Sequence, residues 1–472
     1  MKNSQVSRRR FLTQSAAALS FPTIIPATAI GKGGRPAPSE RITVGNIGYG
    51  TIALHWTPNF LGNTKCQVVS VADPMKEAPH YGYSGEMSGG REVGRRIIDE
   101  YYAEQTGSSG TSCSSFENFE EMLDKEDLDA VVISTPDHWH HYQSIVAARK
   151  GIHLYGQKPI SLSVAGGREI VNEIEKSGIT WQTGSQQRSD VYFRLACELV
   201  RNGRIGKVKR VRVGLPGGHK DFSQLAEQKE TAPLPADFNF DMWLGPAPEM
   251  EYSPALLPLN WRHNFHFSGG MITDFGAHHI DIAQWAMDRE GTGPVEISNV
   301  EGELPPSDAL YNTAGTFSFE AVFEDGLTYH VADESKKLMP ELNTEEKLAG
   351  KKKETHTGIF FEGEDGKWIY VNRGKIDAND RAILRQKPEE GEIKLYESKD
   401  HTDNFLDCVY SGQPTSAPAE TAHRTISIAH LGNIALRLGR QKLAWDPVGE
   451  EVPGDADANA LLSVEPRKPW AL

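Results

Sequence analysis

One lysine of this sequence stands where it could take part in chemistry. Lys158 lies in "YGQKP", after the apolar segment 153–155 and directly before Pro159. Because a proline disfavours the helical conformation in the preceding residue, we expect the backbone at Lys158 to be extended at the end of a strand. An ammonium group fixed there can stabilise an oxygen that develops negative charge. The alternative is an ordinary solvated lysine at a strand end.

A carboxylate and an imidazole form the second candidate group, in the segment "SGGMITDFGAHHIDIAQWAM". If the chain is helical from about Thr273, Asp274 and His278 are four residues apart and share one face. Asp274 could then orient the imidazole as a general base for proton transfer. A metal site and a structural helix histidine are the alternatives. Since no third ligand has suitable spacing, the sequence predicts no metal site.

A glycine-rich turn comes first in the chain. Gly48-x-Gly50-x-x-Ala53 follows the strand-like segment 42–47 and precedes a helical pattern, an order typical of a dinucleotide-binding turn. The strand-like "CQVVSVADP" ends at Asp73, where a carboxylate would accept hydrogen bonds from ribose hydroxyls and repel a 2′-phosphate. The turn therefore predicts NAD rather than NADP, although Asp73 could also merely cap its strand. The cofactor residues predicted here are Gly48, Tyr49, Gly50, Thr51, Ile52 and Asp73.

Further candidates lie where later segments end. Predicted cofactor residues at these positions are Thr135, Pro136, His138, Gln157, Lys158 and Gln187. Predicted substrate residues are Arg188, Trp261, Arg262 and His279. An aromatic ring beside a guanidinium suits stacking on a sugar and binding of its hydroxyls or a carboxylate. His279 lies about 100° round the helix from His278 and need not share its face.

Two predicted sheets must position these residues. Up to about residue 185, continuously apolar strands alternate with helical segments, which predicts a doubly wound parallel sheet covered on both faces. After about residue 203, apolar and polar residues alternate across Gly-containing turns, which predicts a large, mostly antiparallel sheet in an α+β domain. We expect an NAD(P)-binding domain at 41–185 and a substrate domain at 186–472, whose last helices return to the first domain.

Composition limits the partners. The 472 residues carry a net charge of −14 and show no basic stripe, so we do not expect nucleic acid as a partner. No apolar run reaches the roughly 20 residues of a membrane span. The four cysteines are scattered without a C-x-x-C pair and predict neither a zinc site nor a disulfide framework.

The N-terminus has the features of an export signal. Arg8 and Arg9 in Ser-Arg-Arg-x-Phe-Leu precede a stretch rich in small residues that ends at Ala27-Thr28-Ala29. This resembles a twin-arginine signal. We therefore expect a signal peptide at 1–29, a linker at 30–40 and a periplasmic or otherwise exported protein. An ordinary N-terminal helix is the alternative.

The motifs together resemble the Gfo/Idh/MocA oxidoreductase family. They are the Gly48 turn, "STPDHWH", "YGQKP", "GSQQRS" and "GGMITDFGAHHID", and the likeness extends to the ending "KLAWDP…ANALLS". The resemblance implies a Rossmann domain followed by an α/β domain with a large open sheet, often used for homo-oligomer contact. It also implies that Lys158, Asp274 and His278 are catalytic. Gln157 departs from the family pattern, which usually has Glu there, and this changes the charge beside Lys158.

The resemblance implies an NAD(P)-dependent oxidoreductase for a hydroxyl or keto group of a sugar, glycoside or polyol. An exported protein has no obvious supply of fresh NAD, which favours a tightly bound cofactor. One alternative is an NAD-dependent glycoside hydrolase that oxidises its substrate transiently before elimination. A second is a catalytically silent binding or scaffold protein.

Overall fold

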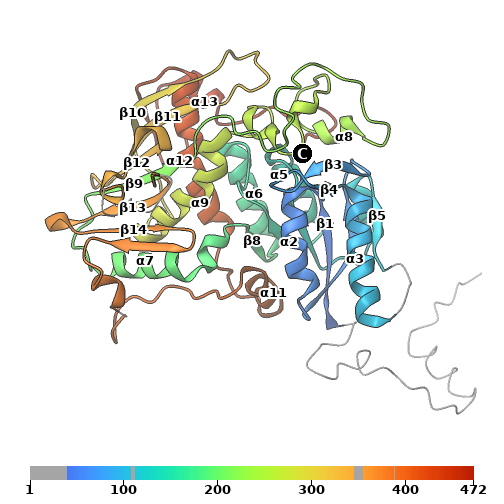
Figure 1. The fold of residues 1–472 in the computed structure, drawn as a ribbon, viewed down its shortest axis with the longest axis horizontal. Coiled ribbons are helices and arrows are strands. Elements are labelled where there is room, and N and C mark those ends of the chain that lie inside the picture. The colour runs from blue at the N-terminus through green and yellow to red at the C-terminus, as the bar shows by residue number, and fades with distance from the viewer. Residues whose placement is uncertain (1–39, 108–111, 345–353, 387) are drawn as a thin grey trace, which may run out of the picture. The chain divides into compact units, whose positions relative to one another are not determined.

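The computed structural model describes residues 40–107, 112–344, 354–386 and 388–472, so the predicted signal and almost all of the predicted linker lie outside the described residues. Residues Ile42–Leu472 form one compact unit. Figure 1 shows a smaller sheet beside a larger one within this unit. None of the described helices combines the length and apolarity that crossing a bilayer requires.

The first sheet is entirely parallel and has the strand order β5-β2-β1-β6-β7-β8. This is the Rossmann order, with the chain reversing direction across the sheet between β1 and β6. Its strands are β1 (Ile42–Ile47), β2 (Cys66–Ala72), β5 (Ser114–Phe116), β6 (Ala130–Ile133), β7 (His153–Gly156) and β8 (Trp181–Thr183).

Helices cover both faces of this sheet, which explains why its strands are apolar throughout. In β6, Ala130 and Val132 join one apolar core and Val131 and Ile133 join the other. Alternate residues of a strand point to opposite faces, so a strand covered on both sides is apolar at every position. The connecting helices are α2 (Thr51–Leu61), α3 (Arg91–Thr106), α4 (Phe119–Lys125), α5 (Asp137–Arg149) and α6 (Val164–Ser177).

Two local details complete this half of the fold. Helix α4 is capped by Asn118, whose side chain accepts from the amide of Glu120. The connection after β2 also forms a small antiparallel ribbon of β3 (Ala78–Tyr81) and β4 (Met87–Gly89), which the sequence pattern does not reveal. Its strands are only four and three residues long, Ala-Pro-His-Tyr and Met-Ser-Gly, too short for the apolar alternation from which strands are recognised.

The second sheet has the order β15-β14-β13-β9-β12-β11-β10-β16. All its neighbouring strands are antiparallel except β9 and β12. The prediction of a large, mostly antiparallel sheet is therefore confirmed. Its strands are β9 (Arg210–Leu215), β10 (Glu296–Glu303), β11 (Thr316–Val322), β12 (Thr328–Asp333), β13 (Gly358–Glu362), β14 (Trp368–Asn372), β15 (Lys375–Ala378) and β16 (Lys442–Ala444).

Three helices pack on one face of this sheet: α7 (Val191–Arg201), α9 (Gly270–Met287) and α12 (Ala419–Arg437). The other face is only partly open, because Leu338 and Met339 pack on Phe360, Trp368 and Tyr370. Homo-oligomer contact through this face stays a prediction, which light scattering on the purified protein would test.

The chain returns to the Rossmann domain near its end. Helix α11 (His401–Ser411) places Phe405 in the core that also holds Tyr155 of β7, with the two rings 5.7 Å apart. Lys65, just before β2, pairs with Asp403 of α11 at 2.7 Å. The last helices therefore help to fix the position of the first sheet.

Candidate functional site

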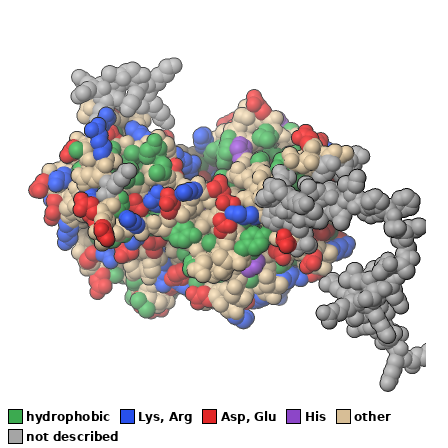
Figure 2. Space-filling model, turned by 90° about the horizontal axis from the view of Figure 1, so that it is seen from below, with side chains coloured by type: hydrophobic (Ala, Val, Ile, Leu, Met, Phe, Trp, Pro, Cys, Tyr) green, Lys and Arg blue, Asp and Glu red, His purple; other side chains and the backbone are tan. Residues whose placement is uncertain are grey.

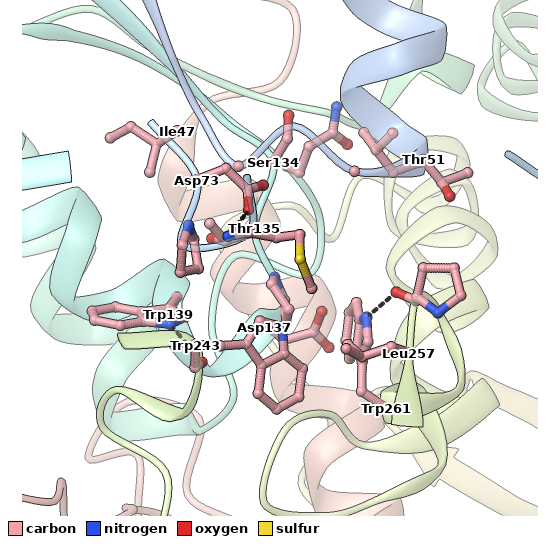
Figure 3. A pocket seen from close by; sticks show the side chains of 18 of the residues that line it. Ile47, Thr51, Asp73, Ser134, Thr135, Asp137, Trp139, Trp243, Leu257 and Trp261 are labelled. Carbon is pink, nitrogen blue, oxygen red and sulfur yellow. Dashed lines mark hydrogen bonds between the residues drawn. The ribbon is translucent and has the colours of Figure 1, made fainter. Parts of the chain in front are cut away.

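Two adjoining cavities lie beyond the carboxyl ends of the Rossmann strands. The first encloses about 950 Å³, including its opening to solvent. Figure 3 shows residues of the sheet edge, such as Asp73 and Thr135, facing Trp243, Leu257 and Trp261 from the second domain. Residues from our prediction that line it are Gly48, Gly50, Thr51, Ile52, Asp73, Thr135, Pro136, Gln157, Lys158, Trp261 and Arg262. We call it the nucleotide cavity.

The glycine turn lies at the floor of the nucleotide cavity. Gly48 has φ +82°, and a Cβ on it would lie 2.9 Å from Cγ2 of Thr135. Only glycine satisfies both the left-handed backbone and this close approach. Helix α2 begins just after, at Thr51, and within the described chain no side chain caps its N-terminus. Its positive end therefore stays available to an anionic group such as a pyrophosphate.

Asp73 ends β2 at the wall of the nucleotide cavity. Its carboxylate accepts hydrogen bonds from the backbone amides of Tyr49 at 2.7 Å and Met75 at 2.8 Å. Burial raises the pKa of Asp73 to about 6, against these hydrogen bonds and the nearby Arg91. The Tyr49 side chain is fully buried and is not part of the cavity wall, so a contact of Tyr49 with the cofactor would be through its backbone and stays a prediction.

His138 also lies behind the nucleotide cavity rather than in its wall. Its Nε2 is 3.0 Å from the carbonyl oxygen of Trp243, a residue that does line the cavity. The structure thus makes His138 a support for Trp243 and corrects its prediction as a cofactor contact. The neighbouring Asp137, which the sequence analysis did not single out, lines the cavity and accepts from Oγ of Ser268 at 2.5 Å. Burial raises the pKa of Asp137 to about 7.

The second cavity, about 1430 Å³ with its opening, lies beside α9. We call it the substrate-side cavity. It shares Ile52, Gln157, Lys158, Leu259 and Arg262 with the nucleotide cavity. Lys158 therefore lies where the two cavities meet.

Lys158 and Asp274 form a buried ion pair at this junction. Nζ of Lys158 donates to Oδ1 of Asp274 at 2.6 Å and to its backbone carbonyl at 2.8 Å, and each side chain is about nine-tenths buried. Nε of Arg262 donates to the same Oδ1 at 3.2 Å. Burial lowers the pKa of Lys158, and the nearby Arg262 lowers it further, whereas Asp274 opposes both. Burial disfavours the Asp274 carboxylate, but the two cations outweigh it and hold its pKa below the ordinary range.

His278 lies one helical turn after Asp274, as predicted, but the expected hydrogen bond between them is not formed. Asp274 Oδ1 is taken by Lys158 and Arg262, and Nδ1 of His278 is buried without a partner among the described residues. His278 lines the substrate-side cavity, and we assign Nε2 as the ring nitrogen that would meet a substrate there. Burial, with Lys158 and Arg373 nearby, holds the pKa of His278 well below its usual value, so the imidazole is neutral.

Two predicted substrate residues lie outside both cavities. Arg188 is buried in an ion pair with Asp281, at 2.7 and 2.8 Å, and also pairs with Glu290. His279 is buried with Nδ1 3.1 Å from the carbonyl oxygen of Gly214. Both side chains hold α9 against its neighbours, so their assignment to the substrate is corrected. The motifs that contain them do not show which way each side chain points.

Trp261 and Arg262 lie in the cavity walls, next to the place predicted for the substrate. Trp261 lines the nucleotide cavity and donates from Nε1 to the carbonyl oxygen of Pro258 at 2.9 Å, as Figure 3 shows. The Arg262 guanidinium stacks on the Trp261 ring, 4.4 Å from its centre. Arg262 lines both cavities, so it reaches the cofactor side as well as the substrate side.

Two glutamines border the substrate-side cavity. Gln157 lines both cavities, and its Nε2 is buried without a hydrogen-bond partner among the described residues. With the Gln187 amide oriented to satisfy both its ends, its nitrogen donates to the carbonyl oxygen of His278 at 3.0 Å and its oxygen accepts from Nε of Arg373 at 3.2 Å. Gln187 thus joins α9 to the turn between β14 and β15.

The structure adds residues that sequence analysis missed. Tyr83, Lys220, Phe222 and Arg373 line the substrate-side cavity from connections in both domains. Each stands in a loop without a recognisable motif, so no sequence signal distinguished it from a solvated surface residue. In the described ranges no three His, Cys, Asp or Glu side chains gather as a metal site would require.

Sequence comparison accounts for nearly the whole folded part of the chain. Residues 42–185 match the description "Oxidoreductase family, NAD-binding Rossmann fold", and residues 192–472 match "Oxidoreductase family, C-terminal alpha/beta domain" of the same group. The protein belongs to the Gfo/Idh/MocA oxidoreductase family.

Curated relatives of this Gfo/Idh/MocA protein match shorter segments. A 1,5-anhydro-D-fructose reductase of Ensifer adhaerens is 30% identical over 169 residues, 36% of this chain and 44% of that protein. A myo-inositol 2-dehydrogenase of Thermotoga maritima is 24% identical over 170 residues, 36% of this chain and 39% of that protein. The matched segments thus span less than half of either relative.

Solved structures share the fold over most of the chain. An aldose–aldose oxidoreductase of Caulobacter crescentus, complexed with glycerol, has a TM-score of 0.55 at 18% identity, covering 86% of this chain and 99% of that one. The WlbA dehydrogenase of Bordetella pertussis, in complex with NADH and UDP-GlcNAcA, has a TM-score of 0.52 at 15% identity, covering 82% and 94%. At these identities the likeness establishes the Gfo/Idh/MocA fold alone.

Proposed function

We propose that this protein is an NAD-dependent oxidoreductase acting on a hydroxyl or keto group of a sugar, glycoside or polyol. The observation that carries the proposal is the position of Lys158, at the junction of a nucleotide cavity and a second cavity that also exposes His278. The relatives named as a sugar reductase and an inositol dehydrogenase support the same reaction class.

The residues of the nucleotide cavity fit a dinucleotide. Gly48 and Gly50 would let the backbone approach the pyrophosphate at the N-terminus of α2, and Asp73 would accept a ribose hydroxyl. Arg91 donates to the carbonyl oxygens of Asp73 and Pro74 and pairs with Glu117, so it is not free for a 2′-phosphate. These contacts support NAD over NADP. When bound, NAD⁺ supplies the hydride acceptor.

The chain's own groups would then handle the proton and the charge. Lys158 would donate a hydrogen bond to the reacting hydroxyl and stabilise the alkoxide that develops as the proton leaves. His278, which is neutral, would accept that proton at Nε2. Asp274 would keep the Lys158 amine protonated and in place, since its carboxylate opposes the effect of burial. In the reductive direction, protonated His278 would return the proton to the product oxygen.

Two substitutions test this assignment. We expect Lys158→Met and His278→Gln each to reduce kcat by about 10²–10⁴-fold, because each removes a group that acts on the reacting oxygen or its proton. NAD binding should be largely retained in both variants. Lys158→Met should lower the melting temperature, because it leaves the buried Asp274 carboxylate with Arg262 alone, whereas His278→Gln should change it little. Unchanged turnover in both variants would refute the mechanism and favour a binding or scaffold role.

A closed reaction cycle is the second candidate. Relatives named 2,7-anhydro-N-acetylneuraminate hydratase occur in Mediterraneibacter gnavus, at 30% identity over 119 residues, and in Escherichia coli, at 25% over 96 residues. Their names indicate reactions without net oxidation, which a transient oxidation and a tightly held cofactor would permit. The NAD-dependent glycoside hydrolase that we considered as an alternative would also work without net oxidation.

One experiment distinguishes an ordinary dehydrogenase from a closed cycle. The purified protein is denatured, and any released small molecule is identified by its mass and absorbance. Stoichiometric NAD(H), with product formed but no net NADH, would support the closed cycle. An empty protein that accumulates NADH with added NAD⁺ would support an ordinary dehydrogenase.

We also propose export through the twin-arginine route, on the Arg8-Arg9 motif. Replacing both by lysine should retain the protein in the cytoplasm of a host with that pathway, as measured by cell fractionation. Export of the Arg8→Lys/Arg9→Lys variant at the wild-type level would refute this assignment.

A further inference from the structure

The lining of the substrate-side cavity holds more cationic side chains than carboxylates to pair with them. Its lining holds four cationic side chains, Lys158, Lys220, Arg262 and Arg373, and one carboxylate, Asp274. Asp274 already binds Lys158 and Arg262. The chain as a whole has a net charge of −14, and acidic and basic side chains are interspersed over the face in Figure 2. The positive excess is therefore a local property of this cavity.

Two of the cations have no carboxylate partner among the described residues, and both line the substrate-side cavity but not the nucleotide cavity. Arg373, in the turn between β14 and β15, stacks over Phe275 at 5.5 Å and is held by the oxygen of Gln187 at 3.2 Å. Lys220 Nζ lies 5.4 Å from the centre of the Phe222 ring. Both residues are exposed to solvent. These contacts hold the two cations beside the cavity, where neither has a carboxylate partner among the described residues.

The other lining groups are donors and ring faces. Gln157 also lines this cavity, and its Nε2 is buried without an acceptor among the described residues. Trp56, Tyr83, Phe222 and Phe275 supply aromatic surface. Aromatic faces suit stacking on a sugar ring, and unpaired cations with donors suit an oxyanion attached to it.

The same charge excess affects the proposed base. Burial, Lys158 and Arg373 all lower the pKa of His278. An anion bound beside Arg373 would offset part of this field, and the imidazole would then accept a proton more readily. The cavity is thus better suited to proton abstraction when it holds an anionic ligand.

We propose that the substrate of this site is an anionic carbohydrate, whose oxyanion group binds Arg373 and Lys220 while the reacting hydroxyl lies at Lys158 and His278. The inference rests on the proposed function for the place of the reaction. A carboxylate, as in a sugar acid, and a phosphate, as in a sugar phosphate, share the required chemistry.

The test compares matched sugars. Calorimetry would measure the binding of D-glucose, D-galactose and D-mannose, of the three corresponding uronates and of the three 6-phosphates to the NAD-saturated full-length protein. We expect at least one anion to bind about tenfold or more tightly than its neutral parent, with an affinity that falls as salt is added. Preference for uronates or for phosphates identifies which oxyanion the site takes.

Variants locate the effect. Arg373→Gln and Lys220→Gln should each remove most of the preference for the anion, read as the ratio of anion affinity to neutral-sugar affinity in the same variant. Arg381→Gln, which removes an exposed arginine outside the cavity, is the matched control and should retain the preference. The proposal is overturned if no anion binds more tightly than its neutral parent sugar. It is also overturned if Arg373→Gln and Lys220→Gln both retain the preference for the anion.

The experiments distinguish a failure of the anionic-substrate inference from a failure of the proposed oxidoreductase function. Turnover of a neutral sugar that depends on Lys158, with no anion preference, overturns this inference and leaves the proposed function in place. Arg373-dependent binding of an anionic sugar, with no turnover that depends on Lys158, supports the inference and refutes the proposed oxidoreductase mechanism.

Discussion

At the scale of single residues, one carboxylate serves two cations. Asp274 holds both Lys158 and Arg262 through Oδ1, inside a site where each of the three side chains is largely buried. A buried ammonium group without a counter-charge would lose its proton readily. Asp274 thus acts on the charge of the lysine, and not on the orientation of His278 as its helical spacing had indicated.

We expect Asp274→Asn to reduce kcat by roughly 10²-fold and to move the basic limb of its pH profile to lower pH. Burial and Arg262 lower the pKa of Lys158, and Asp274 opposes them. Without the carboxylate the pKa of Lys158 falls further, so the ammonium form is lost at lower pH as the pH rises. The measurement is kcat against pH for both proteins.

Asp288→Asn is the matched control for this prediction. Asp288 caps the same helix, α9, at its other end, and its side chain is 79% exposed. Its replacement should leave the profile unchanged. A basic limb that does not move in Asp274→Asn would show that Lys158 is not the group that titrates.

At the scale of elements, the turn from β1 to α2 is fixed by one close approach. We expect Gly48→Ala to weaken NAD binding by roughly tenfold or more, because its Cβ would meet Thr135 and displace the turn. Titration of the protein with NAD measures this.

Gly151→Ala separates crowding from backbone strain. Gly151 has φ +76°, similar to that of Gly48, but a Cβ there meets nothing within 4 Å. Gly151→Ala should lose about 1 kcal/mol of stability through backbone strain alone, and Gly48→Ala should lose more because of the added clash. Only Gly48→Ala should lose nucleotide affinity. Equal affinities in the two variants would contradict the assigned role of the turn.

The strands also differ in how well the sequence pattern predicts them. The parallel strands were predictable because both faces are covered and every position is apolar, as in β6. The ribbon of β3 and β4 was not, since its strands of four and three residues are too short to show a period, and β3 contains a proline. That ribbon contributes Tyr81 to the nucleotide cavity, and Tyr83, in the connection between its strands, lines the substrate-side cavity.

At the scale of the whole molecule, a cluster of ion pairs joins the Rossmann domain to the chain end. Glu450 accepts from Arg168 of α6 at 2.7 Å and lies 2.7 Å from Nε2 of His423 in α12. Burial opposes the Glu450 carboxylate, but His423 and Arg168 outweigh it and lower its pKa to about 2. This acid is therefore more easily ionised in the folded chain than in the unfolded one.

We expect Glu450→Gln to lower the free energy of unfolding by about 2–3 kcal/mol at pH 7. A carboxyl group with a depressed pKa stabilises the fold fully above its unfolded pKa, 4.5, and loses that contribution as the pH falls toward 2. The difference between variant and wild type should therefore shrink below pH 4.5. Denaturant unfolding at pH 7 and at pH 3 measures it.

Glu465→Gln, at an exposed position in the same C-terminal segment, is the control and should not change stability at either pH. A Glu450→Gln variant as stable as wild type at pH 7 would show that the cluster contributes nothing to holding the domains together.

The sequence by itself determined the two-part fold and the principal chemistry. Apolar periodicity depends on which faces are buried, so it revealed the two sheets, and the glycine turn, Asp73 and Lys158 were found because their motifs are local. The order of motifs along the chain identified the family that the comparisons confirm.

Only the tertiary structure decided which side chains meet. Lys158 and Asp274 are 116 residues apart, and their pairing depends on how the fold brings α9 to the segment that follows β7. The same packing directs Arg188 to Asp281 and brings Arg373 to the cavity from a turn that has no motif. Side-chain direction and partner choice follow from the packing of distant elements, which no local pattern encodes.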